Sequence, residues 1–214
     1  MNTSFKTLGA AFSLLLASTV GSLAATLTHD GTNIRLEGTI ERGDSDRLQN
    51  LISVTGISSI QLNSNGGNAL EGYNLGYTLR RNNMQTIVQA GDSCMSACAT
   101  AFLGGTSYTL DGIVGFHVAW SPDDTQTYSD GMKSGQFLGS IDSVYHFNMG
   151  FTAQLQYIVT QVTDSETFLV LDLEDIEMFK MVDGDYTYFI DLPNKWMYER
   201  VADPLRLYLL RGGH

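Results

Sequence analysis

Short apolar runs separated by polar, glycine-containing turns make up most of the chain after residue 25. The run at 69–81 differs from the others, because Leu70, Tyr73 and Tyr77 recur at the spacing of one helix face. Strands therefore alternate with helices, which predicts an α/β fold with a parallel sheet and flanking helices. The predicted strands are 26–28, 33–37, 57–62, 84–89, 108–110 and 113–120, and the predicted helices are 47–52, 69–81 and 99–103.

The pattern changes after residue 120. Residues 121–135 are rich in Asp, Ser, Thr and Gly, which predicts a loop. Residues 136–162 return to helical spacing with a break near Gly150. An acidic helix is predicted at 173–180, and a strand at 186–190.

The N-terminus resembles a secretory leader. Lys6 precedes an apolar, small-residue run, and Ser22-Leu23-Ala24 offers the small residues that a signal peptidase reads. We therefore predict a signal peptide over 1–24, a single domain over 25–192 and a C-terminal tail over 193–214, in a periplasmic or secreted protein. An uncleaved membrane anchor is the alternative for the leader. No later segment is apolar for long enough to predict a membrane span.

The formal net charge of -11 argues against nucleic-acid binding, which needs clustered lysine and arginine. Cys94 and Cys98 are the two cysteines, and an exported protein retains disulfides. Their spacing suits a local disulfide if the backbone turns there, with free buried thiols as the alternative. A metal site is disfavoured because further ligands are lacking nearby. No cofactor is implied.

Two turns carry candidate chemistry, because each follows a strand and opens a helix. Gly66 and Gly67 allow backbone N–H groups to approach a ligand oxygen, as in an oxyanion hole. Ser96 begins the next helix between small residues, and His117 lies further along on an apolar strand. Each feature also has an ordinary structural explanation: a tight turn, a helix-capping serine and a buried core histidine.

Three stretches of the chain carry a family resemblance: Leu62–Gly72, Cys94–Cys98 with Ala101–Gly105, and Gly115–His117. In this order they resemble the exported branch of the Clp-protease-like serine peptidases, which have the ClpP/crotonase-like ββα spiral fold. The resemblance covers about residues 38–183. It implies Ser96 as the nucleophile, His117 as the base, and Gly66, Gly67 and the N–H of Ala97 as the oxyanion hole.

Two positions depart from the family pattern. Asn65 stands where the family usually has proline, which loosens the turn but keeps its donors. The third triad residue maps best to Asp164, although its position is offset, and Glu166 or Asp172 are alternatives. A carboxylate at this position would fix the histidine tautomer and stabilise its positive charge.

The leading prediction is a serine peptidase that cleaves short or unfolded polypeptides. A catalytically inactive binding or assembly protein with the same fold is the alternative. A Ser-Lys mechanism using Lys133 is less favoured because that lysine lies in the predicted polar loop. Relatives with this fold form oligomers, so residues 136–162 are a candidate interface for a homo-oligomer.

Overall fold

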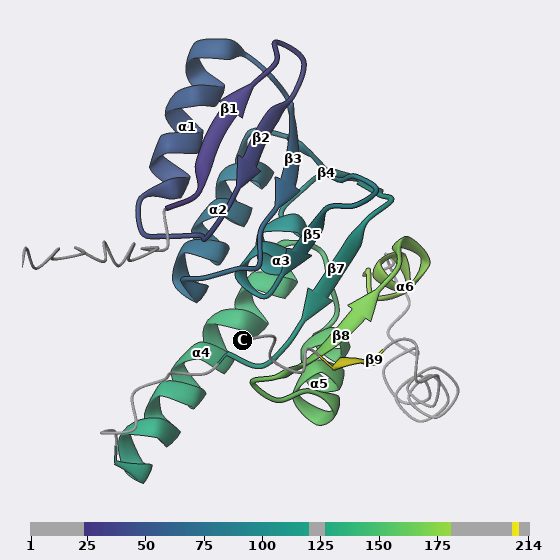
Figure 1. The fold of residues 1–214 in the computed structure, drawn as a ribbon. Coiled ribbons are helices and arrows are strands. Elements are labelled where there is room, and N and C mark those ends of the chain that lie inside the picture. Colours follow the sequence, from purple (N-terminus) through teal and green to yellow (C-terminus); the bar gives the residue numbers. More distant parts are fainter. Residues whose placement is uncertain (1–23, 120–126, 181–206, 210–214) are drawn as a thin grey trace, which may run out of the picture.

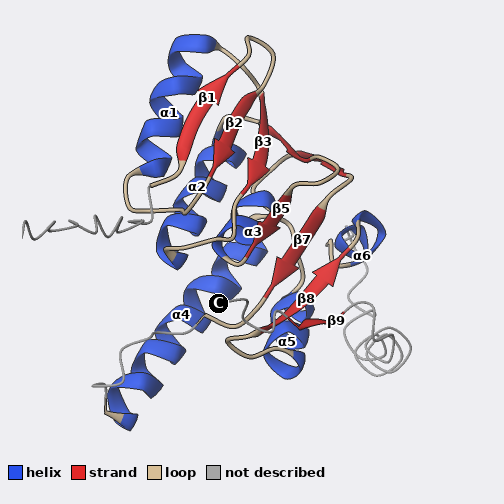
Figure 2. Cartoon of the chain, viewed as in Figure 1, coloured by secondary structure: helices blue, strands red, loops and turns tan. Residues whose placement is uncertain are grey.

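The computed structural model describes residues 24–119, 127–180 and 207–209. Their strands form two sheets that lie side by side in Figures 1 and 2. The first sheet has five strands in the order β1-β2-β3-β4-β6. Its strands are β1 (Thr26–His29), β2 (Ile34–Glu37), β3 (Ser59–Asn63), β4 (Gln85–Val88) and β6 (Ser107–Leu110).

The first sheet is parallel except for β1, which runs antiparallel to β2. Alternate residues of β2 and β3 are buried, with Leu36 and Leu62 paired across the two strands. The alternating pattern puts these side chains in the main core, on the face that the helices cover. The α/β fold class with parallel strands and flanking helices, as predicted from the sequence, is confirmed.

The second sheet has four strands in the order β5-β7-β8-β9. The turns at residues 66–67 and 96 follow β3 and β5, and these two strands belong to different sheets. A parallel bridge between Ser64 and Cys94 joins the two sheets just before these turns. The strands are β5 (Ser93–Met95), β7 (Ile113–Phe116), β8 (Thr167–Leu171) and β9 (Leu207–Leu209).

Helices surround the sheets, with α1 and α2 beside the first sheet and α3 between them and the second (Figure 1). Helix α4 extends beyond the rest of the fold (Figure 1). None of the helices in the described parts of the chain is long and apolar enough to cross a bilayer. The helices are α1 (Asp44–Thr55), α2 (Ala69–Arg81), α3 (Ala97–Phe102), α4 (Tyr128–Asn148), α5 (Ala153–Val162) and α6 (Leu173–Met178).

The prediction of a loop over 121–135 is wrong for residues 128–135, because α4 begins at Tyr128. Thr127 caps this helix by accepting a hydrogen bond from the N–H of Asp130. The first two turns of α4 are exposed, so the polar composition that suggested a loop belongs instead to a solvated helix. The predicted break near Gly150 is present, since α4 ends at Asn148 and Gly150 has a positive φ of 80°.

The predicted leader, apart from Ala24, lies outside the described residues, as do the strand predicted at 186–190 and most of the predicted tail. Within that tail, β9 pairs antiparallel with β8, so this short part of the tail completes the second sheet. Ala24 itself pairs with Thr39.

Candidate functional site

Ser96 occupies a sharp turn between β5 and α3. Its φ of 56° and ψ of -123° lie outside the regions that most residues adopt, a conformation that costs on the order of 1–3 kcal/mol. The N–H of Ser96 donates to the carbonyl of Gly115 at 2.8 Å, which fastens the turn to β7. The surrounding structure therefore holds this serine in a strained backbone with a partly exposed side chain.

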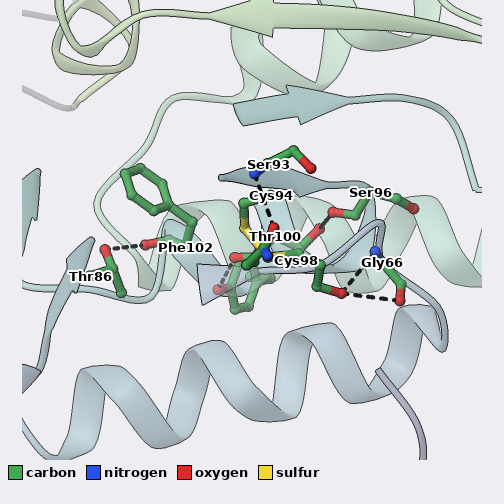
Figure 3. Close-up of a disulfide and its surroundings, with 11 residues drawn as sticks. Gly66, Thr86, Ser93, Cys94, Ser96, Cys98, Thr100 and Phe102 are labelled. Atoms are coloured by element: carbon green, nitrogen blue, oxygen red, sulfur yellow. Dashed lines mark hydrogen bonds between the residues drawn. A yellow bond between two sulfur atoms is a disulfide. The ribbon is translucent and has the colours of Figure 1, made fainter. Parts of the chain in front are cut away.

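Cys94 and Cys98 form a disulfide that spans this turn. Cys94 belongs to β5 and Cys98 to the first turn of α3, and their Cα atoms are 5.0 Å apart. Figure 3 shows the disulfide beside Ser96 and the Gly66 turn. Both cysteines are fully buried. The bond ties the strand before Ser96 to the helix after it and so limits the ways in which the turn can relax.

The hydroxyl of Ser96 contacts His117 rather than the helix end. Ser96 stands at the N-cap of α3, yet its side chain makes no capping hydrogen bond. Its Oγ lies 2.7 Å from Nε2 of His117. An Oγ–H that donates to an unprotonated Nε2 is the arrangement by which histidine activates a serine nucleophile.

His117 lies just after β7 and is half-buried. Its ring stacks on Phe168 of β8 with ring centroids 4.3 Å apart. Burial lowers the pKa of the imidazole, while the backbone carbonyls of Asp164 and Ser165 and the charge of Asp164 act in the opposite direction. The lowered pKa favours the neutral ring, which is the form that accepts a proton.

The carboxylate of Asp164 is engaged elsewhere. Its Oδ1 accepts hydrogen bonds from the backbone N–H groups of Glu166 and Thr167, both at 2.8 Å. These bonds lower the pKa of the exposed Asp164 carboxyl. Nδ1 of His117 has no hydrogen-bond partner among the described residues. Asp164 therefore lies near the ring but uses its side chain to form the turn that leads into β8.

The two alternatives for the third position also have other roles. Glu166 is exposed at the turn before β8. Asp172 caps α6 by accepting a hydrogen bond from the N–H of Asp175 at 2.9 Å. Lys133, the candidate for a Ser-Lys mechanism, is exposed on α4 and does not line the pocket that contains Ser96.

The paired glycines, Gly66 and Gly67, lie in tightly packed surroundings, and Gly66 packs against the turn that carries Ser96. A Cβ on Gly66 would lie 2.7 Å from Cβ of Ser96, and one on Gly67 would lie 2.3 Å from the carbonyl oxygen of Ile40. Both glycines have positive φ, at 97° and 143°. Ile40 pairs with this segment by donating to the carbonyl of Gly66 at 2.8 Å. Only glycine fits either position without displacing backbone.

The three proposed oxyanion donors are not equivalent. The N–H of Gly66 donates to Oγ of Ser64 at 3.0 Å and is therefore occupied. The N–H groups of Gly67 and Ala97 make no hydrogen bond to any residue that the structure describes. Ala97 opens α3, where the first N–H groups of a helix lack intrahelical acceptors. Of the three proposed donors, Gly67 and Ala97 are thus the two whose N–H groups remain open within the described structure.

A pocket of about 280 Å³ lies next to this site and is lined by Ser96 and His117. The described residues contain no group of three or more side chains suited to hold a metal ion. Serine, histidine and open backbone donors make an arrangement that can carry out acyl transfer.

Comparison of the sequence with protein-family models and with curated proteins finds no match. Comparison of the fold with solved structures does find matches. One is a point mutant of ClpP1 from Listeria monocytogenes, with a TM-score of 0.51 and 13% identity, covering 72% of this chain and 90% of that one. Another is a point mutant of the 1510-N membrane-bound stomatin-specific protease, with a TM-score of 0.48 and 15% identity, covering 71% and 76%. The chain therefore has a ClpP-like fold.

Proposed function

We propose that this protein is a serine peptidase in which Ser96 is the nucleophile and His117 the general base. The observation that carries the proposal is the 2.7 Å contact between Oγ of Ser96 and Nε2 of His117. A serine that served only to cap α3 would direct its oxygen at the helix N–H groups instead. The ClpP-like fold supports the same assignment, because ClpP1 from Listeria monocytogenes shares this architecture.

The mechanism follows from the positions of these groups. Ser96 Oγ attacks the carbonyl carbon of the scissile peptide while Nε2 of His117 takes its proton. The resulting oxyanion is stabilised by the N–H groups of Gly67 and Ala97, and Gly66 keeps the turn in place. His117 then donates the proton to the departing amine, and water reverses the sequence to release the acid.

Asp164 remains our proposal for the third member of the site. Its charge and its backbone carbonyl both raise the pKa of His117 and so stabilise the imidazolium formed during attack. The carboxylate lies in an exposed turn, where solvent and dissolved ions screen its charge. It therefore stabilises the imidazolium less than a buried triad aspartate would.

We further propose an exported location, with short or unfolded polypeptides as substrates. The disulfide suits a non-reducing compartment. We also propose a homo-oligomer that uses part of 136–162, because α4 exposes large apolar side chains there. The exposed large apolar side chains in that range are Phe137, Val144 and Phe147 of α4, together with Tyr157 of α5.

A fluorophosphonate probe tests the proposed function. We expect the folded protein to be labelled once, at Ser96, with the site located by mass spectrometry of the digested protein. Heat-denatured protein is the control, because labelling requires the Ser96–His117 contact. An unlabelled native protein, or labelling at another serine, would contradict the proposal.

The labelling rate is expected to depend on pH through His117. Burial lowers the pKa of this ring from its ordinary value of 6.5, and only the neutral ring accepts the proton of Ser96. The rate should therefore rise with pH, reach half its maximum below pH 6.5 and stay level through neutrality. A half-maximal rate above pH 7 would show that the ring is stabilised in its charged form.

One observation favours the alternative of an inactive binding or assembly protein, namely the absence of a carboxylate hydrogen bond to Nδ1 of His117 among the described residues. A protein of this kind would bind peptides at the same pocket without cleaving them. The measurement that separates the two functions is peptide turnover before and after removal of the Ser96 hydroxyl.

A further inference from the structure

The pocket beside Ser96 has an acidic residue on its wall. It is lined on one side by the nucleophile and His117, and on another by residues of α4 that include Asp142 and His146. Its volume of about 280 Å³ is just below the ~300–1,000 Å³ range of pockets for drug-sized ligands. The pocket therefore has the size for a single side chain of a bound peptide.

Helix α4 has glycine at two of the positions that line this pocket, so no side chain of those residues fills it. Gly135, Gly139 and Asp142 follow one another at helical spacing and all line the pocket. A Cβ on Gly135 or Gly139 would meet no atom within 4 Å. Two glycine positions without side chains, one turn apart, thus precede Asp142 along the pocket-lining part of the helix, which also includes Leu138.

Asp142 is buried, with 8% of its surface exposed. Its Oδ1 accepts a hydrogen bond from the hydroxyl of Tyr73 at 2.9 Å, and its Oδ2 lies 3.4 Å from Nδ1 of His146. That nitrogen makes a shorter contact, at 2.9 Å, with the backbone carbonyl of Asp142. Oδ2 therefore retains capacity to accept a hydrogen bond from a ligand.

No lysine or arginine of the described chain forms an ion pair with Asp142. Arg80 of α2 donates instead to the backbone carbonyls of Leu103 and Met149. Burial raises the pKa of Asp142, with His146 and Tyr73 acting against that rise. A buried carboxylate without a full positive partner is costly, and a cation that enters the pocket would remove that cost.

His146 provides a second unsatisfied group at the same wall. It is 4% exposed, it lines the pocket, and its Nε2 has no hydrogen-bond partner among the described residues. Because Nδ1 faces the carbonyl of Asp142, the neutral ring carries its proton on Nδ1 and leaves Nε2 as an acceptor. Both unsatisfied groups are acceptors, so the pocket wall favours a side chain that donates hydrogen bonds.

We infer that this pocket binds the side chain on the acyl side of the scissile bond and that Asp142 selects lysine or arginine there. The inference rests on the proposed function, because it assumes that Ser96 attacks the adjacent carbonyl. A basic side chain would reach past Gly135 and Gly139 and place its charge at the carboxylate. An acidic side chain would be repelled, and a neutral aliphatic chain would leave Asp142 uncompensated.

Two peptide diphenyl phosphonates that differ in one side chain test the inference. One carries lysine at the position next to phosphorus and the other carries norleucine, which has nearly the same length but no charge. We expect the lysine reagent to inactivate the protein at least ~10-fold faster, in line with ~1.4 kcal/mol for one factor of ten. Asp142→Asn should remove most of this ratio. Asp130→Asn, on the same helix but outside the pocket, should preserve it.

Labelling by a simple fluorophosphonate shows whether a negative result contradicts the basic subsite alone or the proposed peptidase function as well. If Ser96 is labelled but lysine and norleucine reagents react equally, or norleucine reacts faster, the basic subsite is wrong and the peptidase stands. If Ser96 is not labelled at all, the proposed function fails and the subsite with it. The wild-type comparison decides the question even if Asp142→Asn does not fold, and retained fluorophosphonate labelling shows that this variant has folded. An unchanged lysine preference in folded Asp142→Asn also overturns the role of Asp142.

Discussion

Peptide hydrolysis is expected to fall by at least ~10³-fold when Ser96 is replaced by alanine, because no other group described at the site can take over nucleophilic attack. The hydroxyl lies 2.7 Å from the only histidine positioned to deprotonate it within the described structure. The substitution adds no volume and keeps the backbone N–H that donates to Gly115. Ser96→Ala should therefore fold normally.

Steady-state turnover of an unstructured peptide and the melting temperature are the two measurements. Ser93→Ala is the matched control, because Ser93 begins β5, the strand that leads into the Ser96 turn, and its hydrogen bond to Oδ1 of Asn63 comes from its backbone N–H. Turnover should survive in that variant. Equal turnover in wild type and Ser96→Ala would assign the activity to a contaminant or another residue, and would leave this protein in the inactive, peptide-binding class.

Alanine at Gly104 is expected to destabilise the whole fold by about 3 kcal/mol or more. Its Cβ would lie 2.3 Å from the carbonyl oxygen of Gly76 and 2.4 Å from the Cα of Gly76, which are backbone atoms of α2. Backbone atoms cannot rotate away as a side chain can, so helix α2 or the segment after α3 must shift. Tyr145 packs against the same turn, since a Cβ on Gly76 would clash with its hydroxyl.

Thermal or urea unfolding followed by circular dichroism measures the effect, which should lower the melting temperature by roughly 10 °C in a chain of this size. Gly131→Ala is the control, because a Cβ there meets no atom within 4 Å and alanine favours a helix. That variant should be as stable as wild type or slightly more stable. Equal stability of Gly104→Ala would mean that Gly76 of α2 and Gly104, which follows α3, do not pack as closely as the structure shows.

This helix contact bears directly on the site. Helix α2 begins just after Gly67, with Asn68 as its cap, and α3 begins just after Ser96. The two helices meet closely at Gly72, where a Cβ would lie 2.6 Å from the carbonyl oxygen of Ala97. Their packing therefore sets the distance between the proposed oxyanion donors and Ser96, the proposed nucleophile. We expect small residues here to matter for function even though they touch no substrate.

Sequence patterns predicted the elements best where periodicity was strong. Helix α2 was predicted with its observed bounds, since its apolar face and its Asn68 cap are both local features. Strands β5 and β8 were missed because short segments carry little periodic signal and gain their pairing from distant partners. The early start of α4 was missed because an exposed, glycine-containing helix has the composition of a loop.

The division of the strands into two sheets was also beyond the sequence. Strand β3 ends where Ser64 pairs with Cys94, and this bridge is a contact between segments that are distant along the chain. No local pattern records which strands will continue one sheet and which will begin another. The change of sheet occurs beside the glycine turn and so helps to bring residues 66–67 against Ser96.

The sequence by itself determined the α/β class, because the pattern of apolar and polar residues is a local property. Its resemblance to the Clp-protease-like peptidases indicated the ClpP-like fold and the candidate chemical groups. Only the tertiary structure decided how those groups are used. It places Oγ of Ser96 within hydrogen-bond distance of His117. The N–H of Gly66 donates a hydrogen bond to Oγ of Ser64, whereas the N–H of Gly67 makes none in the described structure. The tertiary structure also directed the Asp164 carboxylate into a turn and placed Asp142 in the pocket. Each of these outcomes depends on hydrogen bonds and packing between residues whose spacing in the sequence does not specify their distance in space.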